Sequence, residues 1–165
     1  MNTKLAVLAV LAAAVTLTSV ASAGPAVAKQ RVQITMKNLP NATFVLAPLQ
    51  VGALKRDSGT VTFGAPPNYN ARDVIRDGQK VSIYPPVVWA LTGKRGTLTI
   101  RERNEWVDIG TDGNGDGQED GVAFGTWKVV RGTGQYAQIA GGGRSGHAGL
   151  GNPWNARQEG FLTVP

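Results

Sequence analysis

Cysteine is absent from this chain of 165 residues, and histidine occurs only once, at His147. Without cysteine there are no disulfide bonds, so an apolar core must hold the fold together. A single histidine excludes a metal site built from several imidazole groups. A serine-based triad would have to use His147, and no serine here has the G-x-S-x-G context of a nucleophile elbow.

Long hydrophobic runs are scarce, with one exception at the N-terminus. Lys4 precedes an apolar run from Leu5 to about Val20, which ends in the sequence ASA at residues 21–23. A positive segment, an apolar segment and a small-x-small sequence are typical of a cleaved secretory signal. We therefore expect residues 1–23 to be removed, and residues 24–165 to form one secreted domain with no membrane anchor.

Acidic residues are fewer than basic ones, 11 against 17, and the formal net charge is +6 at pH 7. The basic residues are spread along the chain, and the dense group Arg101-Glu102-Arg103 contains an acid of its own. Nucleic-acid binding usually needs a clustered basic stripe. We therefore predict a solvated basic surface and no nucleic-acid partner.

Helical patterns are nearly absent, whereas glycine occurs 22 times. Most apolar runs are short, rich in β-branched residues and bounded by Gly, Pro, Asn or Asp, which is typical of strands. The expected strands cover residues 32–36, 44–46, 60–63, 80–84, 87–91, about 96–109, 122–131, about 142–147 and 157–164. The short connections favour antiparallel pairing. We predict an all-β fold: first an eight-stranded antiparallel up-and-down β-barrel, whose closure removes exposed edges, and second a β-sandwich.

The acidic segment DGNGDGQED, residues 112–120, is similar to a calcium-binding loop. Asp112, Asn114 and Asp116 fit the first ligand positions of an EF-hand, but Ala123 stands where its bidentate glutamate belongs. The flanking segments also predict strands, so an EF-hand is excluded. Two interpretations remain open: a looser calcium site that adds Asp120 as a ligand, or a solvated hairpin loop, which favours the same residue types.

The longest expected strand contains candidate catalytic residues. If Leu98 and Ile100 face the interior, period-two alternation turns Glu102, Asn104 and Trp106 inward as well. Burial raises the pKa of a carboxyl group, so Glu102 is a candidate acid or base and Asn104 a candidate orienting amide. The alternative is a bulge that reverses the alternation, or a strand that leaves the barrel as a solvated ribbon.

Aromatic residues supply candidate ligand contacts, namely Trp89, Trp106, Trp127 and Tyr136. Trp89 and Trp127, like Phe124, are residues that more often pack in a core than form a binding platform, so core packing is predicted for all three and a ligand contact is the alternative. Trp154 lies in the polar segment GNPWNARQ, where it caps a barrel mouth, packs on its own rim or contacts a partner.

Two segments, GTWKVVRGTGQYAQIAGGGRSG (125–146) and LTGKRGTLTIRERNEW (91–106), carry a family resemblance. They resemble proteins built on the allene oxide cyclase barrel, which is related in fold to plant dirigent proteins, and are most similar to secreted bacterial members. The resemblance implies an eight-stranded barrel with an apolar interior. It also implies a short helical hook in which Tyr136, Ala137 and Ile139 close one end. The named relatives cyclise or couple small apolar molecules without a cofactor.

Three functions follow as hypotheses. The first is a secreted, cofactor-free barrel that binds a small apolar ligand in or at its mouth. The second is a cyclase or isomerase that uses Glu102 and Asn104. The third is an extracellular interaction module that uses Trp154 and the acidic loop, with or without calcium. The sequence leaves open the identity of the ligand and the oligomeric state, including a homo-oligomer.

Overall fold

The computed structural model describes residues 28–39, 42–110, 112, 115, 120–149 and 154–164. The expected signal segment, residues 1–23, lies outside this part of the chain. The strands are β1 (Ala28–Leu39), β2 (Thr43–Pro48), β3 (Asp57–Gly64), β4 (Arg72–Arg76), β5 (Gln79–Ile83), β6 (Val87–Gly93), β7 (Gly96–Asp108), β8 (Gly121–Gly132), β9 (Ala140–Gly149) and β10 (Trp154–Val164). One 3-10 turn, η1 (Gly134–Tyr136), connects β8 to β9.

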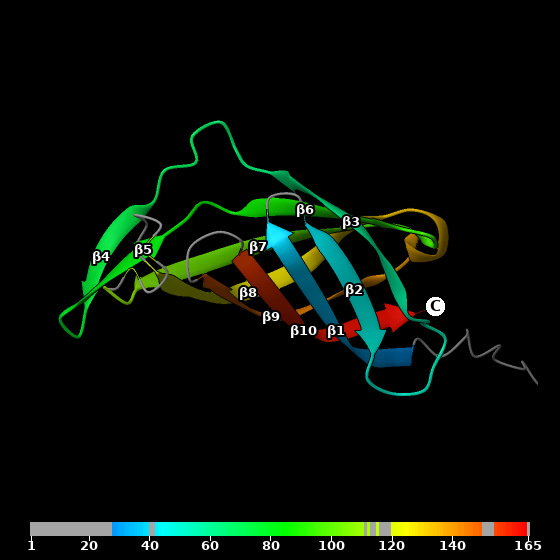
Figure 1. Cartoon of the computed structure of the whole chain (residues 1–165). Helices are drawn as coiled ribbons and strands as arrows, with labels where there is room; N and C mark the ends of the chain where they lie inside the picture. The colour runs from blue at the N-terminus through cyan, green and yellow to red at the C-terminus, as the bar shows by residue number, and fades with distance from the viewer. Residues whose placement is uncertain are drawn as a thin grey trace, which may run out of the picture.

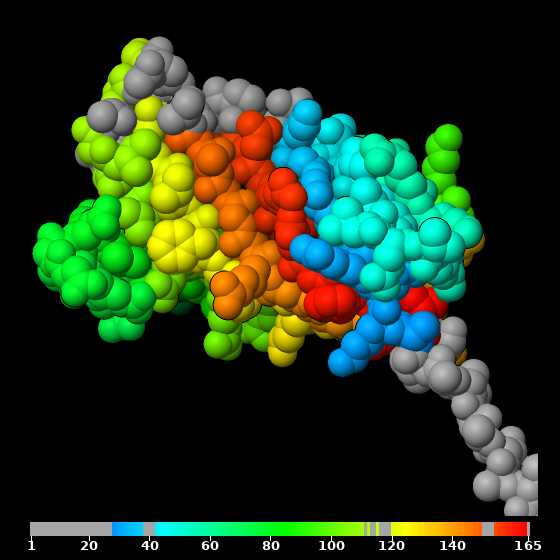
Figure 2. Space-filling model, turned by 90° about the horizontal axis from the view of Figure 1, so that it is seen from below, coloured from blue at the N-terminus to red at the C-terminus, as the bar shows by residue number. Residues whose placement is uncertain are grey.

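All of these strands belong to one antiparallel sheet with the order β4-β5-β7-β6-β3-β2-β1-β10-β9-β8. An additional pairing of β7 with β8 closes eight of them into a barrel and leaves β4 and β5 outside it as a hairpin (Figure 1). From outside, β8, β9, β10, β1 and β2 lie side by side as successive bands from yellow to cyan (Figure 2). The predicted eight-stranded antiparallel barrel is therefore confirmed, and the sandwich is not formed.

The hairpin β4–β5 projects from the barrel (Figure 1). Its turn is Asp77-Gly78, with φ values of 51° and 80°, the positive angles that a two-residue hairpin loop requires. The prediction missed β4 because its sequence RDVIR has only two apolar residues between charged ones. The Arg76 guanidinium donates two hydrogen bonds, of 2.5 and 3.0 Å, to the Glu105 carboxylate on β7.

The hairpin matters because it lengthens one wall of the barrel. The first residue of β6, Val87, pairs with Glu102 on β7. Beyond that point β5 takes over as the partner of β7, from Glu105 to Val107. The second half of β7 therefore stands between β8 and β5 at the mouth of the barrel, and Asn104 and Trp106 lie on it.

Buried and exposed residues alternate on β7 from Ile100 to Arg103, as expected. Leu98, Ile100 and Glu102 are buried in the interior. The irregular pairing between β7 and β8 falls between Thr99 and Ile100 and does not reverse the alternation that follows. Core packing of Phe124 was a wrong prediction, because 49% of this residue is exposed on the outer face of β8. The inward-facing residues around it on β8 are Ala123, Gly125 and Trp127.

The end of the barrel opposite the mouth is closed by the segment around η1. Tyr136 and Ile139 are buried in the apolar core, as the family resemblance implies. Ala137 is exposed, so its expected part in the closure is wrong. No helix among the described residues has the length and apolar character that crossing a lipid bilayer requires.

Candidate functional site

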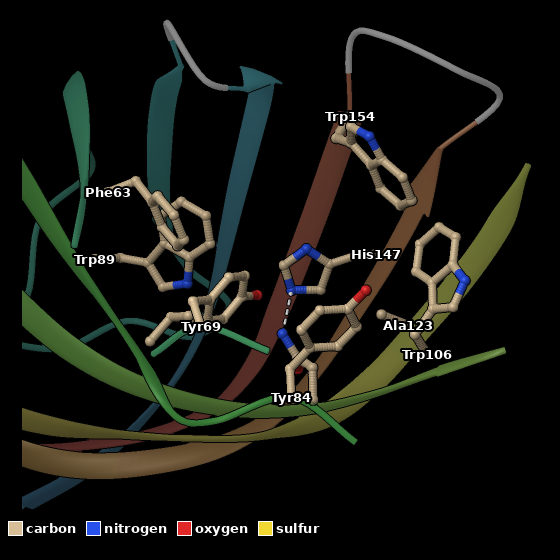
Figure 3. A pocket seen from close by; sticks show the side chains of 10 residues that line it. Phe63, Tyr69, Tyr84, Trp89, Trp106, Ala123, His147 and Trp154 are labelled. Atoms are coloured by element: carbon tan, nitrogen blue, oxygen red, sulfur yellow. Dashed lines mark hydrogen bonds between the residues drawn. The ribbon is translucent and has the colours of Figure 1, made fainter. Parts of the chain in front are cut away.

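A cavity of about 370 Å³ lies at the mouth of the barrel (Figure 3). Its walls come from strands β3, β6, β7, β8, β9 and β10 and from the segments on either side of the β4–β5 hairpin. The lining residues are Phe63, Tyr69, Tyr84, Val87, Trp89, Asn104, Trp106, Ala123, His147 and Trp154. Six of these ten residues are Phe, Tyr or Trp, so the cavity presents flat apolar faces with few polar groups among them.

Four aromatic rings form one side of the cavity. The Phe63 ring lies 4.7 Å from the Trp89 ring and 5.9 Å from the Tyr69 ring, measured between centroids. Tyr69 in turn lies 5.2 Å from Tyr84. These distances are in the range of favourable ring pairs. The contacts position the β3–β4 connection, which carries Tyr69, against the segment after β5.

Two tryptophans form the other side. The Trp106 and Trp154 rings lie 4.4 Å apart, and both side chains are half-buried. Glycines make room for them: a Cβ atom at Gly121 would lie 2.0 Å from the Trp106 ring, and one at Gly149 would lie 2.5 Å from Trp154. A side chain at Gly121 or Gly149 would therefore displace one of the two indole rings from the mouth of the barrel.

Glu102 lies behind the cavity and has no exposed surface. Its Oε2 accepts a hydrogen bond of 2.5 Å from Trp89 Nε1, and its Oε1 lies 2.9 Å from His147 Nε2. Burial by itself raises the pKa of Glu102, but its contacts, above all the hydrogen bond from His147 and also that from Trp89, outweigh it, and the pKa falls below its ordinary value of 4.5. The expected rise of this pKa is therefore wrong, because the sequence does not reveal the donors. At neutral pH Glu102 is a carboxylate.

The charge on Glu102 fixes the tautomer of neutral His147. A carboxylate only accepts hydrogen bonds, so the hydrogen of His147 Nε2 points to Glu102. The amide nitrogen of Asn104 also lies 3.3 Å from Nε2, but with this tautomer both atoms are donors, so the contact is not a hydrogen bond. The second ring nitrogen, Nδ1, has no hydrogen-bond partner in the described part of the chain. His147 stands among the lining residues with this nitrogen on the side away from Asn104 (Figure 3).

Ser145 extends the polar network along β9. Its hydroxyl donates a hydrogen bond of 3.1 Å to Asn104 Oδ1. The intervening strand contributes Gly125, which pairs with Asn104 on one side and with Ser145 on the other. Because Gly125 has no side chain, these two polar groups meet across it. The Glu102–His147 pair and the Asn104–Ser145 pair thus lie side by side beneath the aromatic walls.

The structure brings some of the predicted site residues together and separates others. Asn104, Trp106 and Trp89 line the cavity, and Glu102 lies directly behind it. Trp127 is buried in the core, where its Nε1 donates to the carbonyl oxygen of Arg144. Tyr136 is buried at the opposite end of the barrel. The last two therefore do not line this cavity.

Sequence reasoning missed His147 and Ser145 as members of the site. They occur two residues apart in RSGHAG, so they share one face of β9, and this alternation was the available signal. The surrounding glycines obscured this alternation, because residues without side chains do not distinguish a polar face of the strand from an apolar one. The rings of Phe63, Tyr69 and Tyr84 were also missed, since two of them lie outside strands.

The acidic loop is described only in part. Asp112 is exposed and Asp120 is buried, whereas Asn114 and Asp116 lie outside the described residues. Within the described ranges, no group of three His, Asp or Glu side chains is arranged to hold a metal ion. A calcium site that uses all four residues therefore stays a prediction.

Comparison with protein-family models, with curated proteins and with solved structures gives no match for this chain. The class that the structure itself defines is a closed, eight-stranded antiparallel β-barrel with an aromatic cavity at its mouth.

Proposed function

We propose that this barrel binds a small, largely apolar molecule in the cavity at its mouth, without a cofactor. The observation that carries the proposal is the composition of the cavity wall: six of its residues are Phe, Tyr or Trp, and only His147 and Asn104 add other polar side chains. Ligand sites commonly combine an apolar wall with a few convergent polar groups. The proposed ligand therefore has one or two rings and a single hydrogen-bonding group.

The two parts of the wall have different roles in this proposal. The indole pair Trp106–Trp154 and the rings around Phe63 supply flat surfaces between which a planar ligand stacks. His147 Nδ1 supplies an acceptor for the polar group of the ligand. Burial of apolar ligand surface then provides most of the affinity, at roughly 25 cal/mol per Å², and the polar contact selects the orientation.

We also propose that the protein acts outside the cell after removal of residues 1–23, and that it is distantly related to the allene oxide cyclase and dirigent barrels. The signal-like sequence of residues 1–23 supports the first part. The closed barrel, its apolar interior and the hook at η1 support the second. Mass spectrometry of protein secreted by its own host tests the first part, because it reports the mature N-terminus.

Titration with 2-naphthol, a bicyclic aromatic molecule with one hydroxyl group, tests the ligand proposal. Saturable quenching of tryptophan fluorescence is expected, because tryptophans line the cavity. Trp106→Ala should weaken binding at least about tenfold, since it removes one of the stacking surfaces. Phe161→Ala is the matched control, because Phe161 is half exposed on the outer face of β10 and its loss should leave binding unchanged. Equal losses in both variants would refute the proposed site.

The interaction-module hypothesis makes different use of the same residues. The tilted ring contact between Trp154 and Trp106, with 53° between the ring planes, favours a role of Trp154 in the cavity over a role as an exposed partner contact. Calcium that binds only the folded chain must raise its melting temperature. Unchanged melting at millimolar calcium would remove the metal from that hypothesis and would leave the ligand proposal intact.

A further inference from the structure

We infer that His147 is an acid–base catalyst and that Glu102 is its positioning residue, so that the cavity isomerises a small apolar carbonyl compound by moving a proton between carbons. This inference rests on the proposed ligand site. It revises the hypothesis in which Glu102 and Asn104 act on the substrate directly, because Glu102 has no surface toward the cavity.

The contacts of Glu102 are those of a positioning group. Trp89 holds one carboxylate oxygen and His147 meets the other, at 2.5 and 2.9 Å. Both partners lie on other strands, β6 and β9, and both line the cavity. An unpaired charge in this interior would be strongly unfavourable. The pairing satisfies the carboxylate and, in doing so, fixes the orientation of the imidazole ring.

The orientation of the ring determines the available chemistry. Since the Nε2 hydrogen points to Glu102, neutral His147 has its lone pair on Nδ1. When Nδ1 takes up a proton, the positive charge develops next to a buried carboxylate, which stabilises it. The arrangement is that of a known kind of general base, in which a carboxylate orients an imidazole and the imidazole contacts the substrate atom.

Hydroxyl and amide donors are also available in the cavity. Burial, with smaller contributions from Tyr84 and Glu102, raises the pKa of Tyr69 to about 12, so its hydroxyl stays protonated at neutral pH. Tyr69 and Asn104 both line the cavity. A hydrogen bond from either group to a carbonyl oxygen would stabilise the negative charge that develops there.

The proposed reaction is balanced without a co-reactant. The substrate carries a C=C bond beside the carbon that bears this proton. The C–H bond between the carbonyl group and the C=C bond breaks, its proton moves to His147 Nδ1, and its electron pair forms a dienolate with charge on oxygen. His147 then returns the proton to a different carbon of the conjugated system. The product is an isomer of the substrate, and no electron, water or cofactor is consumed.

The probe 5-nitrobenzisoxazole tests this chemistry without knowledge of the natural substrate. A base removes its ring C–H proton, the N–O bond breaks, and the coloured product 2-cyano-4-nitrophenolate forms. The wild-type chain should accelerate this reaction with saturation kinetics. His147→Gln should lower kcat/KM by about 100-fold or more, and Phe161→Ala should not change it.

Glu102→Gln separates positioning from mere structural support. The introduced amide donates to Nε2, which moves the imidazole hydrogen to Nδ1 and removes the lone pair from the cavity. We expect kcat to fall at least about tenfold, with KM nearly unchanged, because the cavity wall is intact. Equal kcat values for Glu102→Gln and the wild type would overturn the positioning role.

Failure of the catalytic inference can be told apart from failure of the ligand proposal. If the probe quenches tryptophan fluorescence with saturation but reacts equally fast with the wild type and with His147→Gln, the cavity binds and His147 does not catalyse. If the probe and 2-naphthol both fail to bind, the ligand site itself is refuted. Retained 2-naphthol binding by His147→Gln confirms that this variant is folded.

Discussion

The hydroxyl of Tyr136 donates a hydrogen bond of 2.9 Å to the carboxylate of Asp57, which lies 79 residues earlier in the chain. The same carboxylate accepts the backbone N–H groups of Ser58, Lys94 and Arg95. Asp57 therefore connects the start of β3, the turn between β6 and β7, and η1. This cluster closes one end of the barrel, and the candidate site occupies the other.

Removal of the Tyr136 hydroxyl should destabilise the closed end without affecting the cavity. Tyr136→Phe keeps the buried ring and loses one hydrogen bond to a charged acceptor, so we expect the free energy of unfolding to fall by about 1.5 to 3 kcal/mol. Urea denaturation monitored by tryptophan fluorescence measures the change. Binding of 2-naphthol to the folded variant should match the wild type. A variant as stable as the wild type would contradict the role of this bond.

Acid should destabilise the protein through two carboxylates. Burial raises the pKa of Asp57, but hydrogen bonds from Tyr136 and from backbone N–H groups outweigh it, so this pKa lies below its ordinary value of 3.8. The pKa of Glu102 is also lowered, from 4.5. A carboxyl group with a lowered pKa in the folded state stabilises the fold above its unfolded pKa and loses this contribution as pH falls.

We therefore expect the free energy of unfolding to be constant near neutral pH with respect to these groups and to decrease below about pH 4.5. Asp57→Asn should make that decrease less steep, because the variant no longer has the Asp57 carboxylate that takes up a proton on unfolding in acid. Urea denaturation at a series of pH values provides the measurement. If the slope of the Asp57→Asn variant equals that of the wild type, Asp57 does not contribute to the acid sensitivity.

Gly125 should tolerate no side chain. A Cβ atom there would lie 1.8 Å from the carbonyl oxygen of Arg103 and 2.5 Å from Asn104 Oδ1. Gly125→Ala should lower the free energy of unfolding by about 1 to 3 kcal/mol or more and separate Ser145 from Asn104. Gly146→Ala on the neighbouring strand is the control, because a Cβ atom at Gly146 has no neighbour within 4 Å. Thermal melting of both variants makes the comparison, and similar melting temperatures would count against the close fit.

Tyr69 should titrate at unusually high pH. Burial, and then the charges of Tyr84 and Glu102, raise the pKa of its phenol from 10.0 to about 12. The folded state holds this proton more tightly than the unfolded state, so the associated stability is present below pH 10 and is lost as pH rises toward 12. Ultraviolet absorbance of phenolate should show a step near pH 12 that Tyr69→Phe removes. Persistence of the step in that variant would assign it to another tyrosine.

Local sequence determined the architecture and the inward direction of the site residues on β7. Period-two alternation of apolar residues and short turns rich in Gly, Pro, Asn and Asp report strand geometry directly, and they predicted an antiparallel barrel. The same alternation predicted that Glu102, Asn104 and Trp106 face inward, because they follow Leu98 and Ile100 at intervals of two residues. It worked because successive side chains of a strand point to opposite faces, whatever the strand pairs with.

Tertiary structure alone decided what surrounds those side chains. His147 lies 45 residues after Glu102 and meets it only because β7, β8 and β9 pair in one register, with Gly125 leaving space between them. The direction of the Glu102 pKa shift depends on that meeting, since burial and hydrogen bonding act in opposite directions. Closure of the sheet likewise put the apolar side chain of Phe124 on the outer face, although such a side chain is suited to a core. A strand specifies its two faces locally, whereas long-range pairing determines which face becomes the interior and which groups meet there.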